Sequence, residues 1–250
     1  MAGVRALATG ELNRRLAFQR VLRQPRWLVS DLAPTSAELG HPRTYVRGVA
    51  LWYRVRQQGF TMLGCRRART LYRLAVEVER AGVPGSLVDC GVWNGGSTAM
   101  LAAGAPTRAA WAFDSFEGLP EPSEHDPEDA AEWEASCLGR EENVAEAFRR
   151  FAQPNQLHTV KGWFDQTLPE HASRVGPIAV LHADGDWYES IRVTLDSLYD
   201  HVSPGGYVVV DDYSVWSGAK RAVDEFRAER EIGAKLQRAE ASAYWQVTSR

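Results

Sequence analysis

The chain has 250 residues, of which 44% are hydrophobic and 24% charged, and its formal net charge is −3. This length suits one large domain or one domain with an added lid, and the slightly acidic balance argues against a nucleic-acid-binding protein. No run of about eighteen apolar residues predicts a membrane span, and the N-terminus lacks the continuous apolar segment of a secretory signal. The 3 cysteines are widely spaced and predict neither a zinc site nor a disulfide framework, so a cytoplasmic protein is expected.

The part of the chain before the first strand is predicted to be mostly helical. Apolar residues recur at helical spacing over residues 4–23, 44–58 and 66–81. The segment that contains Pro34, Gly40 and Pro42 is the best candidate for a flexible linker. We therefore predict an N-terminal helical lid or dimerisation region over residues 1–84.

From residue 86 the pattern alternates between strand and helix, which is typical of a parallel sheet with covering helices. Strands are predicted at residues 86–92, 109–114, 156–162, 178–183 and 207–211, and two short strands at 234–239 and 243–249 close the sheet antiparallel. Helices are predicted at residues 97–103, 128–152 with a break near Gly139, 165–173, 188–201 and 215–230. The pattern predicts an α/β fold.

A glycine-rich turn follows the first predicted strand. It reads DCGVWNGGS over residues 89–97 and opens a helix, so the backbone can approach a ligand and the helix N-terminus offers free N–H donors. The spacing is neither the dinucleotide fingerprint nor a P-loop. Asp114 ends the second strand, at a position where an acidic residue typically binds ribose hydroxyls. Together, the glycine-rich turn and Asp114 fit a nucleoside ligand without a pyrophosphate, and S-adenosylmethionine is the obvious one. The alternative interpretation is a tight turn with a surface aspartate and no ligand.

Four aspartates follow the fourth and fifth predicted strands: Asp184, Asp186, Asp211 and Asp212. The carboxyl ends of parallel strands meet at one edge of the sheet, where such sheets bind ligands. Grouped carboxylates repel one another unless they hold a cation, and Mg²⁺ prefers oxygen ligands. We therefore predict that Asp184, Asp211 and Asp212 bind one divalent ion, while Asp186 lies further out, toward the substrate. The alternative is that Asp186 and Asp212 cap the helices that follow them.

A bound metal makes a substrate hydroxyl more acidic, and a nearby carboxylate or histidine could then remove its proton. His182 lies in a buried strand, where a packed core residue is the commoner case, and His125 lies in a loop beside acidic residues. Trp163 and Phe164 follow the third strand and either wall an adenine or anchor the core.

Six motifs resemble, in the same order, the TylF/MycF family of macrocin-type O-methyltransferases. They are VDCGVWNGGS, AFDSFEGLPEP, VKGWFDQTLPE, ADGDWYES, LYDHVSPGGYVVVDDY and AVDEFRAE, and the similarity covers about residues 60–250. The resemblance implies a class I methyltransferase fold, a Rossmann-like seven-stranded sheet, over residues 85–250. It also implies Mg²⁺-dependent methyl transfer from S-adenosylmethionine to a sugar hydroxyl of an antibiotic or other glycosylated secondary metabolite. The partners implied are this small-molecule acceptor and a second copy in a homodimer, with no nucleic acid and no membrane.

The resemblance also implies a role for each site residue by its position. Asp184, Asp211 and Asp212 take the metal, and Asp186 is the candidate general base. The cofactor residues are Asp89, Gly91, Trp93, Gly95 and Ser97 around the methionine end, Asp114 and Ser115 at the ribose, Gly162 and Trp163 at the adenine, and Asp184. Asp89 stands where Glu is common, and His182-Ala183 replaces a frequent Arg-Leu pair. Two other interpretations are a catechol or other aryl O-methyltransferase, and a cofactor-binding protein without turnover.

Overall fold

The computed structural model describes residues 31–152 and 156–248, so the helix predicted at 4–23 lies outside the described residues. The helices are α3 (Ser36–Leu39), α4 (Pro42–Gln57), α5 (Cys65–Ala81), α6 (Gly96–Gly104), α7 (Glu141–Phe151), α8 (Phe164–Val175), α9 (Tyr188–Leu198) and α10 (Ser217–Glu229), with 3₁₀ turns η1 (Glu128–Trp133) and η2 (Tyr199–His201). The strands are β1 (Ser86–Cys90), β2 (Ala110–Asp114), β3 (Leu157–Lys161), β4 (Ile178–Ala183), β5 (Val202–Val210), β6 (Gln237–Ala239) and β7 (Ser242–Gln246).

The strands form one seven-stranded sheet in the order β3-β2-β1-β4-β5-β7-β6. The first five are parallel, while β7 pairs antiparallel with both β5 and β6. The predicted fold is therefore confirmed, including its antiparallel closure. From β1 the chain adds strands first toward one edge of the sheet (β2, β3) and then, from β4, toward the other, so the strand order reverses between β1 and β4. The crevice at the carboxyl ends of the strands beside such a switch point is where open α/β sheets bind ligands.

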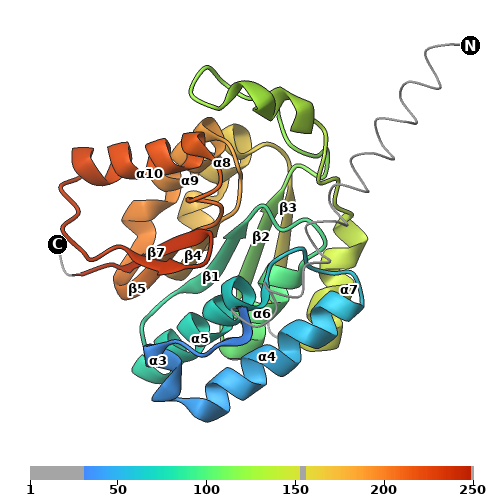
Figure 1. Cartoon of the computed structure of the whole chain (residues 1–250), viewed down its shortest axis with the longest axis vertical. Helices are drawn as coiled ribbons and strands as arrows, with labels where there is room; N and C mark the ends of the chain where they lie inside the picture. Colours follow the sequence, from blue (N-terminus) through green and yellow to red (C-terminus); the bar gives the residue numbers. More distant parts are fainter. Residues whose placement is uncertain (1–30, 153–155, 249–250) are drawn as a thin grey trace, which may run out of the picture.

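Helices cover both faces of the sheet (Figure 1), with α4 to α7 on one face and α8 to α10 on the other. Successive side chains of a strand point to opposite faces, so each face has its own core. Leu87 belongs to the core under α5 and α6, and its neighbour Val88 belongs to the core under α8 and α9. All six residues of β4 are buried, as expected for a central parallel strand.

The helix α5 is part of the layer that covers the sheet. Its residues Leu71 and Leu74 share one buried cluster with Leu87 of β1 and Ala179 of β4. The core therefore continues across the predicted boundary after residue 84, and a lid built from residues 1–84 stays a prediction. In the described part of the chain no helix has the length and apolar character needed to cross a lipid bilayer.

The predicted flexible linker is wrong for the described residues. Pro42 is the first residue of α4, a position that proline favours because its missing N–H is not needed there. Ahead of it, Thr35 and Glu38 form a capping box at α3. The helix predicted at 128–152 is split into η1 and α7, and a side chain at Gly139 would lie 2.4 Å from the carbonyl oxygen of Trp93.

Candidate active site

A cavity of about 880 Å³ opens at the carboxyl edge of the sheet. Its walls come from the loops that follow β1 to β5, from the segment before α5 and from the turn between β6 and β7. Six predicted cofactor residues line it: Gly91, Trp93, Asp114, Ser115, Trp163 and Asp184. Its size lies within the usual range of small-molecule sites.

Asp89 and Ser97 lie below the glycine-rich turn instead of lining this cavity. The Asp89 carboxylate is 1% exposed and accepts hydrogen bonds from the Ser97 hydroxyl at 2.8 Å and the Thr98 hydroxyl at 2.6 Å. Its other oxygen lies 2.7 Å from Nδ1 of His182. Burial opposes the charged imidazole, but the hydrogen bond that its N–H donates to the Asp89 carboxylate outweighs burial and raises the pKa of His182. These side chains therefore hold the turn to β4 from beneath; Ser97 also borders a small adjoining cavity.

Gly91 brings the glycine-rich turn against the start of the acidic loop. Its φ is +91°, and a Cβ there would lie 1.9 Å from the carbonyl oxygen of Asp184, so no other residue fits without a backbone shift. Gly95 has φ +83°, and a Cβ would lie 2.6 Å from Cα of Val144 in α7. The absence of a side chain at Gly95 thus lets the start of α6 pack closely against α7. Neither Gly95 nor Gly162 lines the cavity described above.

Asp114 ties the glycine-rich turn to the end of β2. Its carboxylate accepts hydrogen bonds from the backbone N–H of Trp93 at 2.8 Å and of Phe116 at 2.7 Å. Burial raises the pKa of Asp114 even though these donors favour its charged form. Each carboxylate oxygen has two lone pairs, so the group can still accept hydrogen bonds from a ligand in the cavity.

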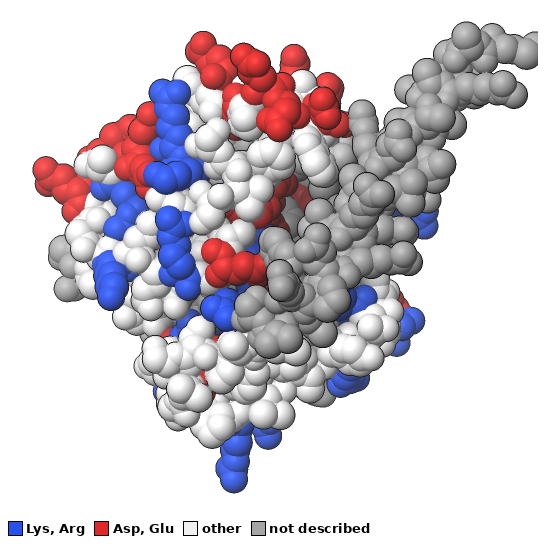
Figure 2. Space-filling view, in the orientation of Figure 1, with Lys and Arg blue, Asp and Glu red and all other residues white. Residues whose placement is uncertain are grey.

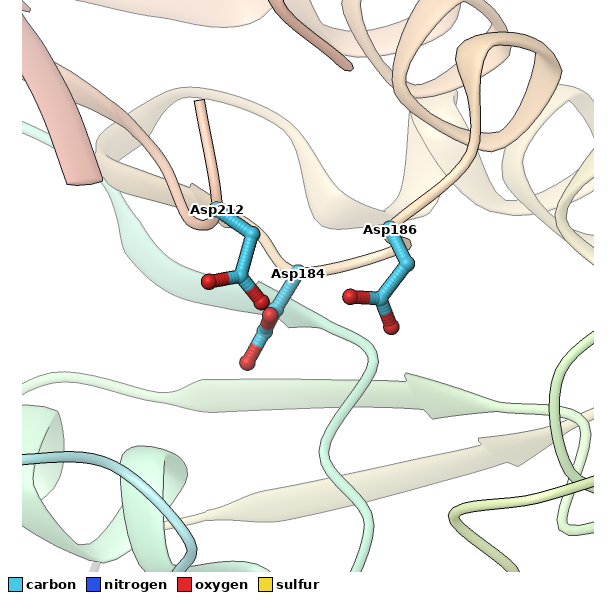
Figure 3. A group of neighbouring side chains, drawn as sticks. All are labelled: Asp184, Asp186 and Asp212. Carbon is cyan, nitrogen blue, oxygen red and sulfur yellow. The ribbon is translucent and has the colours of Figure 1, made fainter. Parts of the chain in front are cut away.

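Three carboxylates converge where β4 and β5 end. Asp184, Asp186 and Asp212 offer oxygens that all lie within 4.8 Å of one another, and Figure 3 shows the three side chains pointing to the same side of their loops. Asp211 is not in this group. It is 2% exposed, and its oxygens accept hydrogen bonds from Ser242 and from Arg67. The structure thus places Asp211 apart from the predicted arrangement, and its role as a ligand stays a prediction.

The crowding of the carboxylates disfavours their charged forms. Burial and then the charge of Asp211 raise the pKa values of Asp184 and Asp212 well above the usual range. Burial likewise raises the pKa of Asp186 to about 6. A hard divalent cation would relieve this repulsion, because it takes oxygen ligands and favours ionised carboxylates. The donor set therefore fits a Mg²⁺-type ion.

Arg67 of α5 is a site residue that the sequence did not reveal. Its Nη1 donates to Asp211 at 2.5 Å and to Asp212 at 2.9 Å. Burial lowers the pKa of Arg67, but Asp211 and Asp212 outweigh this effect and raise it. Four arginines occur between residues 66 and 73, so no spacing signal singles out this one.

Four tryptophans also line the cavity and were missed: Trp52, Trp133, Trp187 and Trp216. Nε1 of Trp216 donates to Oδ1 of Asp186 at 3.0 Å. The signal was present in the chain, because Trp187 and Trp216 follow the two acidic strand ends by a few residues. No histidine of the described residues lines the cavity, which leaves Asp186 as the candidate base.

The lining of the cavity is rich in acidic residues. Ten of its lining residues are acidic and two are arginines. Figure 2 shows further acidic side chains gathered over the segment that borders it, where the exposed ones are Glu121, Glu124, Glu128, Asp129, Glu132 and Glu134. Such a field favours cationic ligands and disfavours anionic ones.

Comparison with known proteins identifies close similarities. Residues 45–247 match the model of the family described as Macrocin-O-methyltransferase (TylF). The demethyldecarbamoylnovobiocin O-methyltransferase of Streptomyces niveus is 38% identical over 200 residues, which are 75% of this chain and 76% of that protein. The 8-demethyl-8-(2,3-dimethoxy-alpha-L-rhamnosyl)-tetracenomycin-C 4'-O-methyltransferase of Streptomyces olivaceus is 34% identical over 210 residues, or 76% of each chain. The solved structure of the O-methyltransferase NovP has a TM-score of 0.68 at 35% identity and covers 76% of this chain and 83% of that one.

Proposed function

We propose that this chain, which belongs to the macrocin O-methyltransferase (TylF) family, methylates a sugar hydroxyl of a glycosylated secondary metabolite with the help of Mg²⁺. Its family and relatives make it an S-adenosylmethionine-dependent O-methyltransferase; the sugar and the metal belong to the proposal. The observation that carries the proposal is the group of carboxylates beside the glycine-rich turn, inside one cavity.

The cofactor is proposed to lie between the glycine-rich turn and the loop after β3, where S-adenosylmethionine would present an electrophilic methyl group. Gly91 leaves the backbone open toward the methionine end, and Asp114 has lone pairs for the ribose hydroxyls. Trp163 would flank the adenine. The acidic lining suits this cofactor because both its sulfonium and its ammonium are positive.

The metal is proposed to bind to Asp184 and Asp212, whose oxygens lie within 4.8 Å of each other, and to Asp211 as the third predicted ligand, although Asp211 lies outside that group. Support comes from Arg67, because one cationic nitrogen already lies 2.5 Å from Asp211 and 2.9 Å from Asp212. Bound Mg²⁺ would lower the pKa of an acceptor hydroxyl. Asp186 holds a neutral donor, Trp216, in place of a cation, and it is the group proposed to accept the hydroxyl proton.

The acceptor is proposed to be a sugar that carries no strongly anionic group. One relative is named as the 4'-O-methyltransferase of a rhamnosyl-bearing tetracenomycin. The wall formed by Trp133, Trp187 and Trp216 offers flat apolar surface to a sugar ring, and the acidic lining would repel a phosphorylated one.

An acceptor panel tests this proposal. Desmethyl glycosides and a simple catechol are incubated with enzyme, S-adenosylmethionine and Mg²⁺, and methylated product is measured by mass spectrometry. We expect methylation of a glycoside and loss of this activity with a chelator. In Asp184→Asn we expect kcat to fall about 10²–10³-fold, as when a group that stabilises charge in the transition state is removed. Asp196→Asn is the matched control and should keep full turnover, because Asp196 lies on α9, pairs with Arg192 and does not line the cavity.

Two results would contradict the proposal. Undiminished turnover of Asp184→Asn in chelator would exclude the metal mechanism. Methylation of the catechol alone, with every glycoside untouched, would favour an aryl acceptor.

A further inference from the structure

Asp186 lies in a tight loop between β4 and α9 that fixes its backbone. Its φ is +60°, in the left-handed region, which aspartate tolerates better than most other side chains. The residue before it must be small, because a Cβ at Gly185 would lie 2.7 Å from Cβ of Ser190. The carbonyl of Gly185 accepts a hydrogen bond from the N–H of Trp187 at 2.6 Å. The loop therefore fixes the backbone position from which the Asp186 side chain extends. The residues around that side chain then determine how its carboxylate is rotated.

Asp186 has side-chain hydrogen bonds with Asp212 and with Trp216. Of these two neighbours, the indole of Trp216 is the neutral donor placed to set that rotation. Its Nε1 lies 3.0 Å from Oδ1 of Asp186, and its ring meets Trp187 and Trp133 edge to face, with centroids 4.9 Å and 6.0 Å apart. The backbone N–H of Trp216 also donates to the carbonyl of Asp212 at 3.0 Å. The ring is thus held from two sides and from its own backbone.

Trp187, which packs against Trp216, is itself anchored. It is 1% exposed, and its Nε1 donates to the carbonyl of Pro120 at 2.9 Å. Rotation of Trp187 would leave the Pro120 carbonyl without its hydrogen bond, so the Trp187 ring keeps its orientation. The ring of Trp216 therefore packs against a fixed neighbour. The hydrogen bond to Asp186 therefore ends a chain of contacts that begins in the loop after β2.

We infer that Trp216 is a positioning residue: its N–H holds one oxygen of Asp186 so that the other faces the acceptor hydroxyl. An indole N–H only donates, so Trp216 does not take the proton itself. Fixing the carboxylate before the reaction removes a rotational cost from the transition state. The inference rests on the proposed function, in which Asp186 is the base.

The test replaces Trp216 by Phe, which keeps an aromatic ring and removes the N–H. We expect kcat to fall about 10–100-fold, since a displaced catalytic group costs about 10² in rate. The KM for the acceptor and the affinity for S-adenosylhomocysteine, measured by calorimetry, should stay within about twofold of the unmodified enzyme, because uniform binding is kept. Benzothienylalanine at position 216 repeats the test with a ring of nearly unchanged shape that also lacks the N–H.

Trp245→Phe is the matched control. Its ring is buried outside the cavity, and its Nε1 has no hydrogen-bond partner among the described residues. The same substitution there should leave kcat within about twofold, because no group in the site loses a donor.

A double-mutant cycle then separates this inference from the function on which it rests. If Trp216 acts through Asp186, then Trp216→Phe should change kcat by less than about twofold in an Asp186→Asn background. Full turnover of Asp186→Asn would overturn both the base and the inference. A slow Asp186→Asn enzyme together with an unimpaired Trp216→Phe enzyme would overturn the inference alone. A raised KM with unchanged kcat in Trp216→Phe would also overturn it, since the ring would then only bind the acceptor.

Discussion

Arg67 brings a positive charge into a group of four aspartates. Its side chain is 18% exposed, and one nitrogen is shared between Asp211 and Asp212. Without a counter-charge, carboxylates this close together would be driven either to protonate or to separate. Arg67 thus holds together an arrangement that would otherwise repel itself.

Replacing Arg67 by Met tests this balance. In buffer with a chelator we expect the variant to be less stable by about 3 kcal/mol, because removing one partner leaves buried charge uncompensated. Millimolar Mg²⁺ should then recover more stability in Arg67→Met than in the unmodified protein, since the ion takes over the same carboxylates. Urea denaturation with and without Mg²⁺ measures both effects.

Arg66→Met serves as the control for Arg67→Met, because the guanidinium of Arg66 donates to the carbonyl of Ala33. Equal stability of Arg67→Met and the unmodified protein in chelator would contradict the role of Arg67 as a counter-charge.

The parts of the site that lie at strand ends were predictable from the sequence. Asp114, Asp184 and Asp212 each end or follow a β-rich run, and parallel strands bring such ends together. Arg67 was not predictable, because it reaches the site from α5, a helix whose packing no local pattern encodes.

Asp89 illustrates a different limit. Sequence order placed it at the cofactor, but in the sheet it lies directly opposite His182 of β4, and the two side chains pair. Only the register of β1 against β4, which the sequence does not give, reveals this partner.

At the scale of elements, the short helix α3 is fixed to α5 by a buried ion pair. Oε1 of Glu38 lies 2.7 Å from Nε of Arg69, and the side chains are 2% and 1% exposed. Glu38 also caps α3 through Thr35. Burial raises the pKa of Glu38, but hydrogen bonds from Arg69 and Thr35 outweigh burial and lower it below its usual 4.5.

This pair predicts a pH-dependent loss of stability. Because the folded pKa of Glu38 is below the unfolded one, its contribution is present above about pH 4.5 and is lost as the pH falls through the folded pKa. Glu38→Gln should therefore be about 3 kcal/mol less stable at pH 7, and the difference should shrink as the pH falls below the usual pKa of 4.5. Urea unfolding across this pH range measures it.

Glu146→Gln is the control for Glu38→Gln, since Glu146 pairs with Arg149 and Arg150 on the exposed face of α7. The stability of Glu146→Gln should be nearly unchanged, because exposed ion pairs contribute little. A gap between Glu38→Gln and the unmodified protein that stays constant down to pH 3 would contradict the assignment.

Glycine and proline residues mark the ends of some helices in this chain, but not of all. The helical spacing over residues 66–81 stops just before Gly82, and Gly82 is the left-handed cap of α5. Pro204 follows the helix predicted at 188–201 and precedes the strand predicted at 207–211, yet it lies inside β5, where the pairing with β4 is irregular. A proline fits there because an irregular stretch does not need its missing N–H. Composition alone does not distinguish these two uses.

The whole molecule is organised around one cavity whose walls come from many loops. Since five loops, the segment before α5 and a hairpin turn all contribute lining residues, a ligand that fills the cavity links elements from both helical layers. Ligand binding should therefore stabilise the fold as a whole.

At a concentration 100 times its dissociation constant, S-adenosylhomocysteine should stabilise the protein by about 2.7 kcal/mol. For a chain of this size that corresponds to a rise in Tm of about 5–11 °C, which scanning fluorimetry measures. Binding detected by calorimetry without a rise in Tm would contradict a site built across the two layers.

The antiparallel closure of the sheet has a practical consequence for anyone who wishes to attach this enzyme to a support. The helix α10 begins at Ser217, directly after the cavity residue Trp216, and ends at Glu229. The segment from residue 230 to 236 therefore lies at the opposite edge of the sheet, where β6 begins. A Cβ at Gly233 would meet no atom within 4 Å. A cysteine introduced there offers an anchor for resin or dye that leaves the cavity mouth facing the solution.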